Sequence, residues 1–572
     1  MKERGMLYRI AAVALVLFLG LLGLIGRLGY LHLGNHSKIA WEFNSETLGL
    51  RGTIYDCYGT SYPMAVSLPA RLYFIDPQAV NKKHTHKINE MAKTVAACMK
   101  LPVEQVLSYY APTNASRYNK LGITSDDRIY DILGNKTNIS GVASQDITIR
   151  TYPQGSRMAH VLGFVDKNDG GYGLERSLDR YLKGTPGRIT GVKAARGGEI
   201  RDRRRLDVQP IPGANVFLTL DHNIQFEVEK VLEETVQQFK AIGGWSIVQE
   251  VNTGRILAMA VYPSFDPVNY SQETGDVWRN NAIGKIYEPG SIMKAISVAA
   301  VLNERLVTPN TLIDVGAGTW FYANKPLRDH VTGHITVSTA LAKSSNIACA
   351  KMGLMLGPDR IERYLRAFGF GDKLGIDLSG EEQNLLGRAK TWDGLKPTRI
   401  PIGQGVAVTA IQMINAYSTL ANGGTLYRPY AIDRIVAANG EVIFQNTPTA
   451  IGRPVRPEVA KQVREMLIGV TEEGGTGKRA NVKGYTIAGK TGTAQKAVPG
   501  GYSSTDYYAS FVGFLPAHKP VVSILVSIDR PQPIHTGGYV AAPAFAKIAA
   551  ATARIREIPP DLPEQLVQEE QE

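Results

Sequence analysis

Ser291 and Lys294 stand three residues apart in "YEPGSIMKAIS", where a glycine turn leads into an apolar helix. Residues at i and i+3 share one helix face, so the lysine amine is expected within reach of the serine hydroxyl. A serine becomes a nucleophile when a neighbouring base takes its proton. Burial, a helix N-terminus or a second cation lowers the pKa of a lysine enough for it to be that base. The alternative is a capped helix start followed by an exposed lysine, and this pair alone favours that alternative.

Two further motifs lie in the same half of the chain. The S-x-N sequence occurs once, at Ser344 to Asn346, and the K-T-G sequence occurs once, at Lys490 to Gly492, with Thr493 directly after it. The order S-x-x-K, S-x-N and K-T-G is a known mechanistic set for nucleophilic serine chemistry. Three independent chance matches in this order would be rare, so the set favours a nucleophile with its base over a capped helix.

The elements that must hold these motifs lie in residues 211–555. Apolar or alternating runs predict strands, and runs with helical spacing predict helices, one of them stopped by two glycines. The strand candidates are "NVFLTLD", "WSIVQEV", "RILAMAVYP", "YASFVGFLP" and "VVSILVSID", and the helix candidates are "IQFEVEKVLEETVQQF" and "AVTAIQMINAYSTLANGG". We expect an α/β (α+β) domain with an antiparallel central sheet flanked by helices.

The N-terminus predicts a membrane anchor. Residues 1–9 form a short positive tail, and Ile10 to Gly26 is an apolar run without charge. A signal peptide would have an apolar core of about 7–15 residues and a small-x-small cleavage site. Since this run is longer and has no such site, we expect an uncleaved helix over residues 10–30. Its positive flank places the N-terminus in the cytoplasm and the rest of the chain outside.

Residues 31–210 predict a mixed region with glycine-rich turns. Arg201 to Val216 combines a charge run with two prolines and marks a boundary. Its arginines fit either a grip on an anionic partner or a solvated linker, and the linker is favoured. The acidic, proline-containing stretch 556–572 predicts a disordered tail.

The composition narrows the classes of partner and cofactor. A net charge of +12 and a pI of about 9.3 fit nucleic acid, anionic lipid or a polyanionic cell wall. No aromatic-and-basic RNA-binding pattern and no zinc-finger spacing is present, so no nucleic acid partner is expected. The three cysteines lack metal-site spacing, and "EEGGTGKR" departs from a phosphate loop. We therefore expect no cofactor and no metal.

The motifs and their surroundings resemble the class B penicillin-binding proteins, most of all the division-type FtsI family. The stretches that carry this resemblance are "RNNAIGKIYEPGSIMK", "IPIGQGVAVTAIQMINAYSTLANGG", "GGTGKRANVKGYTIAGKTGTAQK", "GYVAAPAFAKI", "RGTIYDCYG" and "YPQGSRMAHVLGFV". Together they cover most of the chain from 51 to about 550. The resemblance implies a penicillin-binding-protein/serine β-lactamase-like transpeptidase domain in 211–555, an elongated N-terminal pedestal (PBP dimerisation-like) domain in 31–210 and one membrane helix.

The resemblance also implies catalytic roles. Ser291 would attack the carbonyl of a D-Ala–D-Ala peptide and form an acyl-enzyme that releases the terminal D-Ala. Lys294 would be its base, Ser344 would relay a proton toward the leaving amine, and Asn346 would orient the lysine and hold the donor amide. Penicillin would acylate Ser291 as a mimic of the dipeptide.

For substrate binding, the resemblance implies that Lys490 adds positive potential, keeps the catalytic lysine neutral and binds the substrate carboxylate. Thr491 and Thr493 would hydrogen-bond that carboxylate, and Gly492 would let the substrate approach the strand. The backbone N–H groups of Ser291 and Thr493 would form the oxyanion hole, where losing a donor costs on the order of 10²–10³ in rate.

Four rival activities share parts of this pattern. A class A β-lactamase also needs a deacylating glutamate. No E-x-x-L-N motif that would carry this glutamate lies between the second and third motifs, and the nearest string, "EEQN" at 381–384, has the wrong spacing. A β-lactam sensor would need cytoplasmic machinery, and nine residues precede the apolar run. A carboxypeptidase, which uses water as acceptor, and a catalytically silent scaffold stay open.

Partners and cellular place follow from the same resemblance. The expected partners are peptidoglycan stem peptides ending in D-Ala–D-Ala, β-lactams, a polytopic membrane glycosyltransferase and divisome proteins. The chain would be a single-pass protein of the bacterial cytoplasmic (inner) membrane with its catalytic domain outside. A septal division role is favoured over elongation and sporulation roles, since the pedestal is compact and the cytoplasmic tail short.

Overall fold

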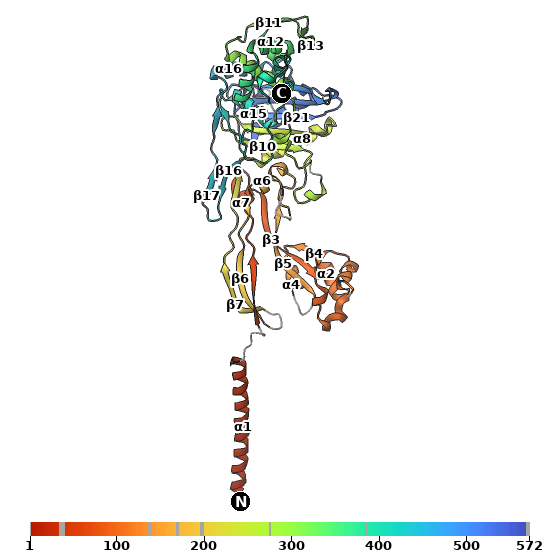
Figure 1. Cartoon of the computed structure of the whole chain (residues 1–572), viewed down its shortest axis with the longest axis vertical. Helices are drawn as coiled ribbons and strands as arrows, with labels where there is room; N and C mark the ends of the chain where they lie inside the picture. Colours follow the sequence, from red (N-terminus) through yellow and green to blue (C-terminus); the bar gives the residue numbers. More distant parts are fainter. Residues whose placement is uncertain are drawn as a thin grey trace. The chain divides into compact units, whose positions relative to one another are not determined.

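The computed structural model describes residues 2–33, 40–111, 113–134, 139–166, 171–194, 199–273, 276–383 and 386–567. The chain forms two compact units (Figure 1), of which the smaller joins Met1–Leu50 to Gly184–Pro212 and the larger joins Arg51–Lys183 to Gly213–Glu572. The expected pedestal, 31–210, is therefore divided between them. Strand pairing is the reason, because β2 (Ile54–Tyr55) pairs in parallel with β8 (Asn215–Leu218).

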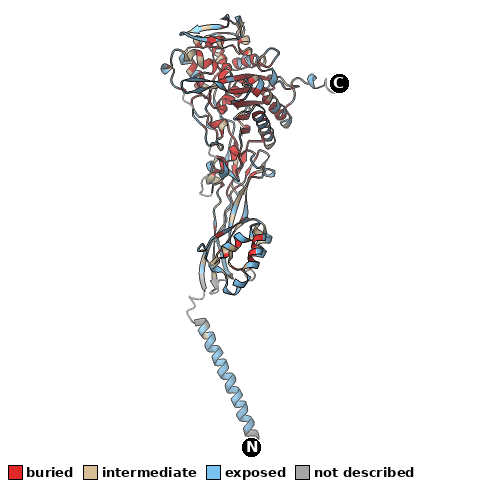
Figure 2. Ribbon diagram, turned by 90° about the vertical axis from the view of Figure 1, so that its right-hand side faces the viewer, coloured by how far each residue is buried: buried red, intermediate tan, exposed pale blue. Residues whose placement is uncertain are grey.

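The smaller unit contains the apolar helix and a three-stranded sheet. Helix α1 (Lys2–Leu33) includes a stretch, Gly5–Tyr30, that is long and apolar enough to cross a membrane, with a mean hydropathy of 2.4. This stretch is exposed, as its pale blue colour in Figure 2 shows. The antiparallel sheet has the order β1 (Ala40–Thr47), β6 (Gly187–Ala194), β7 (Glu199–Val208).

The larger unit begins with a mixed sheet in the order β17-β16-β8-β2-β3-β4, to which β5 is added by pairing with β3. Ile54, Val216 and Ile435 are cross-strand neighbours on β2, β8 and β16, and all three are buried. The remaining strands of this sheet are β3 (Pro63–Ile75), β4 (Asn119–Thr124), β5 (Val142–Thr151), β16 (Ile432–Val436) and β17 (Val442–Gln445).

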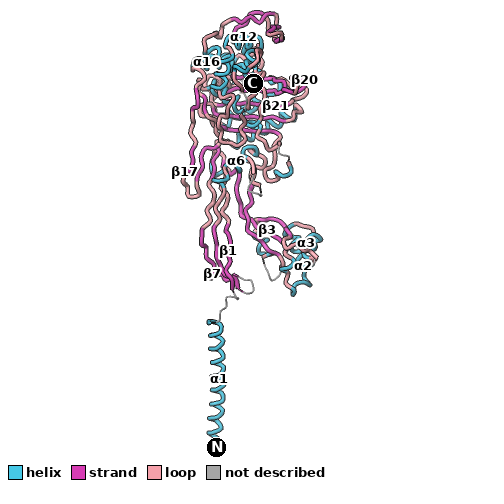
Figure 3. The backbone as a smooth tube through the Cα atoms, viewed as in Figure 1, coloured by secondary structure: helices cyan, strands magenta, loops and turns pink. Residues whose placement is uncertain are grey.

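Three helices form a separate small core with the outer part of this sheet (Figure 3). Met91 and Val95 lie one turn apart on the buried side of the first helix and share this core with Tyr73 of β3, as expected for an amphipathic helix. The helices are α2 (Ile88–Met99), α3 (Val103–Tyr110) and α4 (Asp127–Leu133).

A buried ion cluster lies where the short helices α5 (Ala159–Leu162), α6 (Gly173–Ser177) and α7 (Asp179–Leu182) follow this sheet. The side chain of Glu175 is fully buried, and its two oxygens accept from Nε of Arg51 and Nε of Arg150 at 2.7 Å each. A buried carboxylate with two arginine partners is compensated, whereas removal of one member leaves an unpaired charge inside the protein.

A five-stranded antiparallel sheet forms the centre of the expected catalytic half, the part of the larger unit from residue 213 onward that carries the three motifs. Its strand order is β10-β9-β21-β20-β19. Helices α8 (His222–Gln238) and α17 (Gly537–Ile555) pack against it, and Val228 and Phe545 share its core. Every residue of β21 is buried, because both faces of the sheet are covered. The strands are β9 (Gly243–Glu250), β10 (Ile256–Tyr262), β19 (Ala488–Val498), β20 (Gly501–Leu515) and β21 (Val522–Asp529).

Helices surround a central helix, α15 (Ala410–Ala421), in which every residue is buried and which begins with a capping box of Thr409 and Gln412. The other helices of this half are α9 (Asn281–Gly284), α10 (Lys294–Asn303), α11 (Val337–Ala342), α12 (Asn346–Leu356), α13 (Pro358–Ala367), α14 (Lys396–Arg399), α16 (Pro457–Ile468) and α18 (Glu564–Val567). Three two-stranded antiparallel sheets pair β11 (Leu312–Gly316) with β14 (Gly333–Thr336), β12 (Thr319–Tyr322) with β13 (Lys325–Arg328), and β15 (Leu426–Tyr427) with β18 (Ala450–Gly452). The 3₁₀ turns are η2 (Gly59–Ser61), η3 (Pro77–Ala79), η4 (Lys82–Lys87), η5 (Tyr270–Gln272), η6 (Gly290–Met293), η7 (Ala389–Thr391), η8 (Ile400–Ile402) and η9 (Lys478–Ala480).

The expected disordered tail is wrong for its described part, residues 556–567. Ile558 is buried, and its carbonyl oxygen accepts from the hydroxyl of Tyr485 at 2.6 Å. Oδ1 of Asp561 accepts from the N–H of Thr486 at 2.8 Å. The acidic composition of this stretch concealed the apolar and backbone contacts that hold it against the catalytic half.

Candidate active site

The first two motifs meet at the buried amine of Lys294. This residue begins α10, directly after the turn η6, and is fully buried. Its Nζ donates to the carbonyl oxygen of Ser344 at 2.6 Å and to Oδ1 of Asn346 at 2.7 Å, and it lies 3.0 Å from Oγ of Ser344. An amine in this position can exchange a proton with the Ser344 hydroxyl while the two other contacts fix its orientation.

The S-x-N turn has a conformation that its surroundings must stabilise. Ser344 has a φ of 60°, and a left-handed conformation costs a residue with a side chain about 1–3 kcal/mol. Ser345 caps α12, because its Oγ accepts from the N–H of Ala348 at 3.1 Å. Nδ2 of Asn346 donates to the carbonyl oxygen of Arg328 at 3.1 Å, which leaves its amide oxygen facing the lysine.

The third motif lies on β19, the edge strand of the sheet. Lys490 is fully buried, and its Nζ lies 3.3 Å from both the carbonyl oxygen and Oγ1 of Thr491. Oγ1 of Thr491 is 2.8 Å from Oγ1 of Thr476. Oγ1 of Thr493 accepts from the N–H of Gly537 at 3.1 Å, where α17 begins. The loop before β19 and the helix after β21 therefore fix both threonine hydroxyls.

Burial lowers the pKa of both lysines. The pKa of Lys294 falls to about 8, and the neighbouring Cys349 thiol and Asp329 carboxylate limit the fall. The pKa of Lys490 falls well below its ordinary value through burial and through the nearby ammonium of Lys294. The two amines therefore compete for protons in one buried space, and a lysine with a pKa near neutrality can act as a general base.

Ser291 lies in the turn η6, three residues before Lys294, and among the described residues no hydrogen bond joins the two side chains. The turn is packed closely, since the N–H of Gly290 donates to the carbonyl oxygen of Gly403 at 3.1 Å. A Cβ on Gly403 would come within 2.0 Å of the Gly290 oxygen, and its φ is 79°. Only glycine fits there, so this contact fixes the backbone that carries Ser291.

Gly492 lies close to the turn that carries Ser291. A Cβ on this residue would lie 3.1 Å from Cγ2 of Ile292 and 3.2 Å from the carbonyl oxygen of Pro289. The space beside Gly492 is therefore taken by protein. Its missing side chain lets β19 approach the turn that carries Ser291.

Sequence reasoning missed Asp329, which follows β13 in the segment between α10 and α11. Its side chain is fully buried, and its Oδ2 accepts from the hydroxyl of Ser345 and from the N–H of Ile347, the latter at 3.1 Å. Asp329 therefore holds the S-x-N turn together with the cap of α12. In the sequence it is one aspartate in a turn-like stretch, which does not distinguish it from an ordinary turn residue.

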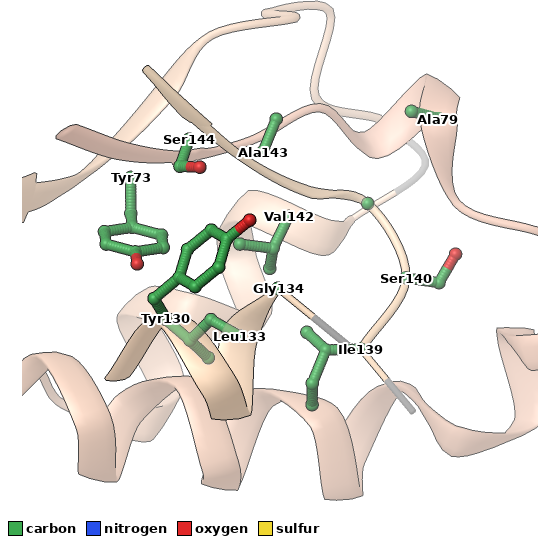
Figure 4. Close-up of a pocket in the computed structure, with 11 residues that line it drawn as sticks. Tyr73, Ala79, Tyr130, Leu133, Gly134, Ile139, Ser140, Val142, Ala143 and Ser144 are labelled. Atoms are coloured by element: carbon green, nitrogen blue, oxygen red, sulfur yellow. The ribbon is translucent and has the colours of Figure 1, made fainter. Parts of the chain in front are cut away.

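Two other features lie outside this site. Glu381, the first residue of the rejected "EEQN" string, is buried and accepts from the N–H groups of Leu374 and Gly375 at 2.7 and 3.0 Å, so it holds a loop. A cavity of about 470 Å³ lies between β5 and α4 and contains no motif residue (Figure 4). Its lining includes Tyr73, Tyr130, Leu133, Ile139, Val142 and Ser144.

Two family models match the chain. The model of the penicillin binding protein transpeptidase domain matches residues 244–550, more than half of the chain and all three motifs. The model of the penicillin-binding protein dimerisation domain matches residues 46–218. The two matches together extend from the first strand of the smaller unit to α17.

Relatives and solved structures agree with these models. Stage V sporulation protein D of Bacillus subtilis is 32% identical over 538 residues, which cover 91% of this chain and 81% of the relative. Peptidoglycan D,D-transpeptidase FtsI of Escherichia coli is 30% identical over 524 residues, which cover 89% of this chain and 84% of the relative. Penicillin binding protein 3 of Mycobacterium tuberculosis, in complex with aztreonam, superposes with a TM-score of 0.70 at 29% identity over 90% of this chain and 98% of that chain.

Proposed function

Because the chain belongs to the class B penicillin-binding proteins, we propose that it is a serine D,D-transpeptidase that cross-links peptidoglycan stem peptides and is acylated by β-lactams. The observation that carries this proposal is the buried amine of Lys294, which contacts both Ser344 and Asn346. With a pKa of about 8, this amine can take the proton of a serine nucleophile.

In the first half-reaction, Oγ of Ser291 attacks the carbonyl carbon of the penultimate D-Ala, and its proton passes to Nζ of Lys294. The C–N bond to the terminal D-Ala then breaks. The leaving amine receives a proton through Oγ of Ser344, which lies 3.0 Å from Nζ of Lys294. An ester between Ser291 and the donor peptide remains.

In the second half-reaction, the amine of a neighbouring stem peptide attacks this ester. Lys294 accepts the proton of the amine, and Oγ of Ser291 leaves as a hydroxyl. The donor carboxylate is bound by Lys490, Thr491 and Thr493 before the first step. The N–H groups of residues 291 and 493 stabilise the oxyanion of each tetrahedral intermediate.

Covalent labelling tests the acyl-enzyme. The full-length protein in detergent is incubated with a fluorescent penicillin, and Ser291→Ala is the control. We expect a stable labelled band for the wild type and none for the variant. An unlabelled wild type would refute the acyl-enzyme, and rapid loss of the label would point to a hydrolase. Donor peptide with and without an amine acceptor then separates a cross-linked product from a carboxypeptidase product.

We further propose that α1 anchors the chain in the cytoplasmic membrane, with residues 1–9 in the cytoplasm and the catalytic half outside. The similarity to FtsI supports a septal role beside a polytopic glycosyltransferase and divisome proteins. The similarity to stage V sporulation protein D supports a sporulation role as the second candidate. Depletion separates these roles, because filamentous cells indicate division, rounded cells indicate elongation, and normal growth with defective spores indicates sporulation.

A further inference from the structure

The edge strand β19 sets the direction of a bound donor peptide. In the proposed function, on which this inference rests, the donor carboxylate lies at Thr491 and the scissile carbonyl lies at the N–H of Thr493. Peptides that bind to the edge of a sheet extend along the strand. The part of the donor upstream of the scissile bond therefore runs toward Val498, where β19 turns into β20.

The end of this path is close to Tyr502. This residue pairs with Ala497 across the β19–β20 hairpin, and Ala497 lies four residues beyond Thr493, about 13 Å along an extended strand. The hydroxyl of Tyr502 donates to Oε1 of Glu288 at 3.3 Å, and the positive charge of Arg399 acts on it from another direction.

Arg399 lies close to the segment that packs on the turn of Ser291 and to β13. It ends α14, and its carbonyl oxygen accepts from the N–H of Gln404 at 3.1 Å, next to the glycine that packs on the nucleophile turn. Its Nη2 is 3.5 Å from the carbonyl oxygen of Pro326 in β13. The same strand carries Arg328, whose carbonyl oxygen binds Asn346 of the S-x-N motif.

The charge of Arg399 is uncompensated within the described part of the chain. The side chain is partly buried, and burial lowers its pKa, with only the Tyr502 side chain opposing the fall. The nearby acid Glu288 accepts at Oε1 from the N–H of Gly405 and from Tyr502. Its Oε2 has no hydrogen-bond partner in the described part of the chain, and no ion pair there joins Glu288 to Arg399. The strand β13, whose Pro326 oxygen lies beside Arg399, also carries two exposed cations, Lys325 and Arg328. An arginine fork that is partly desolvated and lacks a carboxylate suits a bidentate carboxylate ligand.

We propose that Arg399 binds a carboxylate of the donor stem peptide, two or three residues upstream of the penultimate D-Ala. These residues lie about 7–10 Å along the path, and the side chain that carries the carboxylate covers the rest of the distance. This subsite makes the enzyme selective for acidic donors. It acts on binding of the donor and leaves the chemistry at Ser291 unchanged, because the carboxylate lies at the far end of the path from the scissile bond.

Two donor peptides that end in D-Ala–D-Ala test the proposal. They are identical except that one carries glutamate and the other glutamine two residues upstream of the penultimate D-Ala. Acyl-enzyme formation is measured with the full-length wild type, Arg399→Gln, Arg399→Lys and Lys390→Gln. Lys390 is an exposed cation in η7, so its replacement removes the same charge elsewhere on the surface.

For Arg399→Gln we expect KM for the glutamate donor to rise about tenfold or more, with kcat nearly unchanged and no comparable change for the glutamine donor. Arg399→Lys should recover part of the difference, and Lys390→Gln should resemble the wild type. Acylation by benzylpenicillin, which lacks an upstream carboxylate, should be unchanged in every variant and shows that the catalytic centre is intact.

Equal KM values of the wild type for the two donors, or an equal rise for both donors in Arg399→Gln, would overturn the subsite. Failure of the wild type to form an acyl-enzyme with either donor or with benzylpenicillin would overturn the proposed function instead. These two failures are distinct, because benzylpenicillin tests only Ser291 and its base.

Discussion

Replacing Asp329 by asparagine is expected to move the pH dependence of acylation to lower pH. The fully buried carboxylate of Asp329 contacts Ser345 and Ile347, the neighbours of the residues that bind Lys294. Burial lowers the pKa of Lys294 to about 8, and the negative charge of Asp329 opposes that fall. Without this charge the amine releases its proton at lower pH. The other ionisable groups near these residues are Cys349, Lys490 and the exposed His330, whose Nδ1 lies 3.6 Å from Oδ1 of Asp329.

The size of the effect follows from the fraction of free amine. A base with a pKa of about 8 is neutral in roughly one molecule in ten at pH 7, and a fall to about 7 raises this fraction to about one half. A shift of about one unit, the lower end of the effect of a nearby carboxylate, therefore raises the fraction of free amine about fivefold at pH 7. Against this gain, neutral hydrogen bonds replace charge-assisted ones to Ser345 and Ile347, at a cost of about 1 kcal/mol.

The assay is the rate of acylation by benzylpenicillin between about pH 6 and 9.5, fitted for the midpoint of the acidic limb. Ser345→Ala is the matched variant, because it removes the hydroxyl that Asp329 binds and leaves the charge in place. We expect a lower midpoint for Asp329→Asn and an unchanged midpoint with a lower rate for Ser345→Ala. The charge argument is refuted if Asp329→Asn keeps the wild-type midpoint.

Two other substitutions and one truncation test the packing of the larger unit. Gly403→Ala places a methyl group 2.0 Å from the oxygen of Gly290, so benzylpenicillin acylation should fall about 100-fold, and an unchanged rate would contradict the tight turn. Glu175→Gln breaks a buried pair with two arginines and should cost about 3 kcal/mol of unfolding free energy, seen as a lower thermal midpoint. A chain that ends at Arg556 loses the packed tail and should melt at lower temperature than the full chain, whereas equal midpoints would argue against the role of that tail.

The catalytic fold could be predicted because its signals are local. Ordered motifs and strand-like runs such as residues 522–529 indicated a transpeptidase domain with an antiparallel sheet, and the family models and solved structures confirm both. The roles of the motif residues remain predictions, although Lys294, Ser344 and Asn346 do meet in one network. The prediction that 556–572 is disordered was wrong for its described part. Composition alone does not reveal that Ile558 is buried and that its carbonyl oxygen accepts from the hydroxyl of Tyr485.

Residues that act across the fold could not be predicted from the sequence. Asp329 follows the β12–β13 hairpin and contacts Ser345 and Ile347. The pairing of these short strands places Asp329 there, and strands this short have no clear pattern in the sequence. Arg399 is one of many basic residues in a chain with a net charge of +12. Only its tertiary position, partly buried and without a carboxylate partner in the described chain, distinguishes it. Spacing in the sequence carries no information on either contact.

The charge balance of the catalytic centre connects these residues. Lys294, Lys490 and Asp329 are buried together, and burial disfavours an unbalanced charge. One protonated lysine beside one aspartate is neutral, which leaves the other lysine as a free amine. Lys294 keeps a pKa of about 8 whereas that of Lys490 falls well below its ordinary value, so without substrate the proton favours Lys294. In the proposed function, a donor carboxylate at the K-T-G strand would move this proton to Lys490 and free Lys294, the amine that contacts the Ser344 hydroxyl, to act as the base.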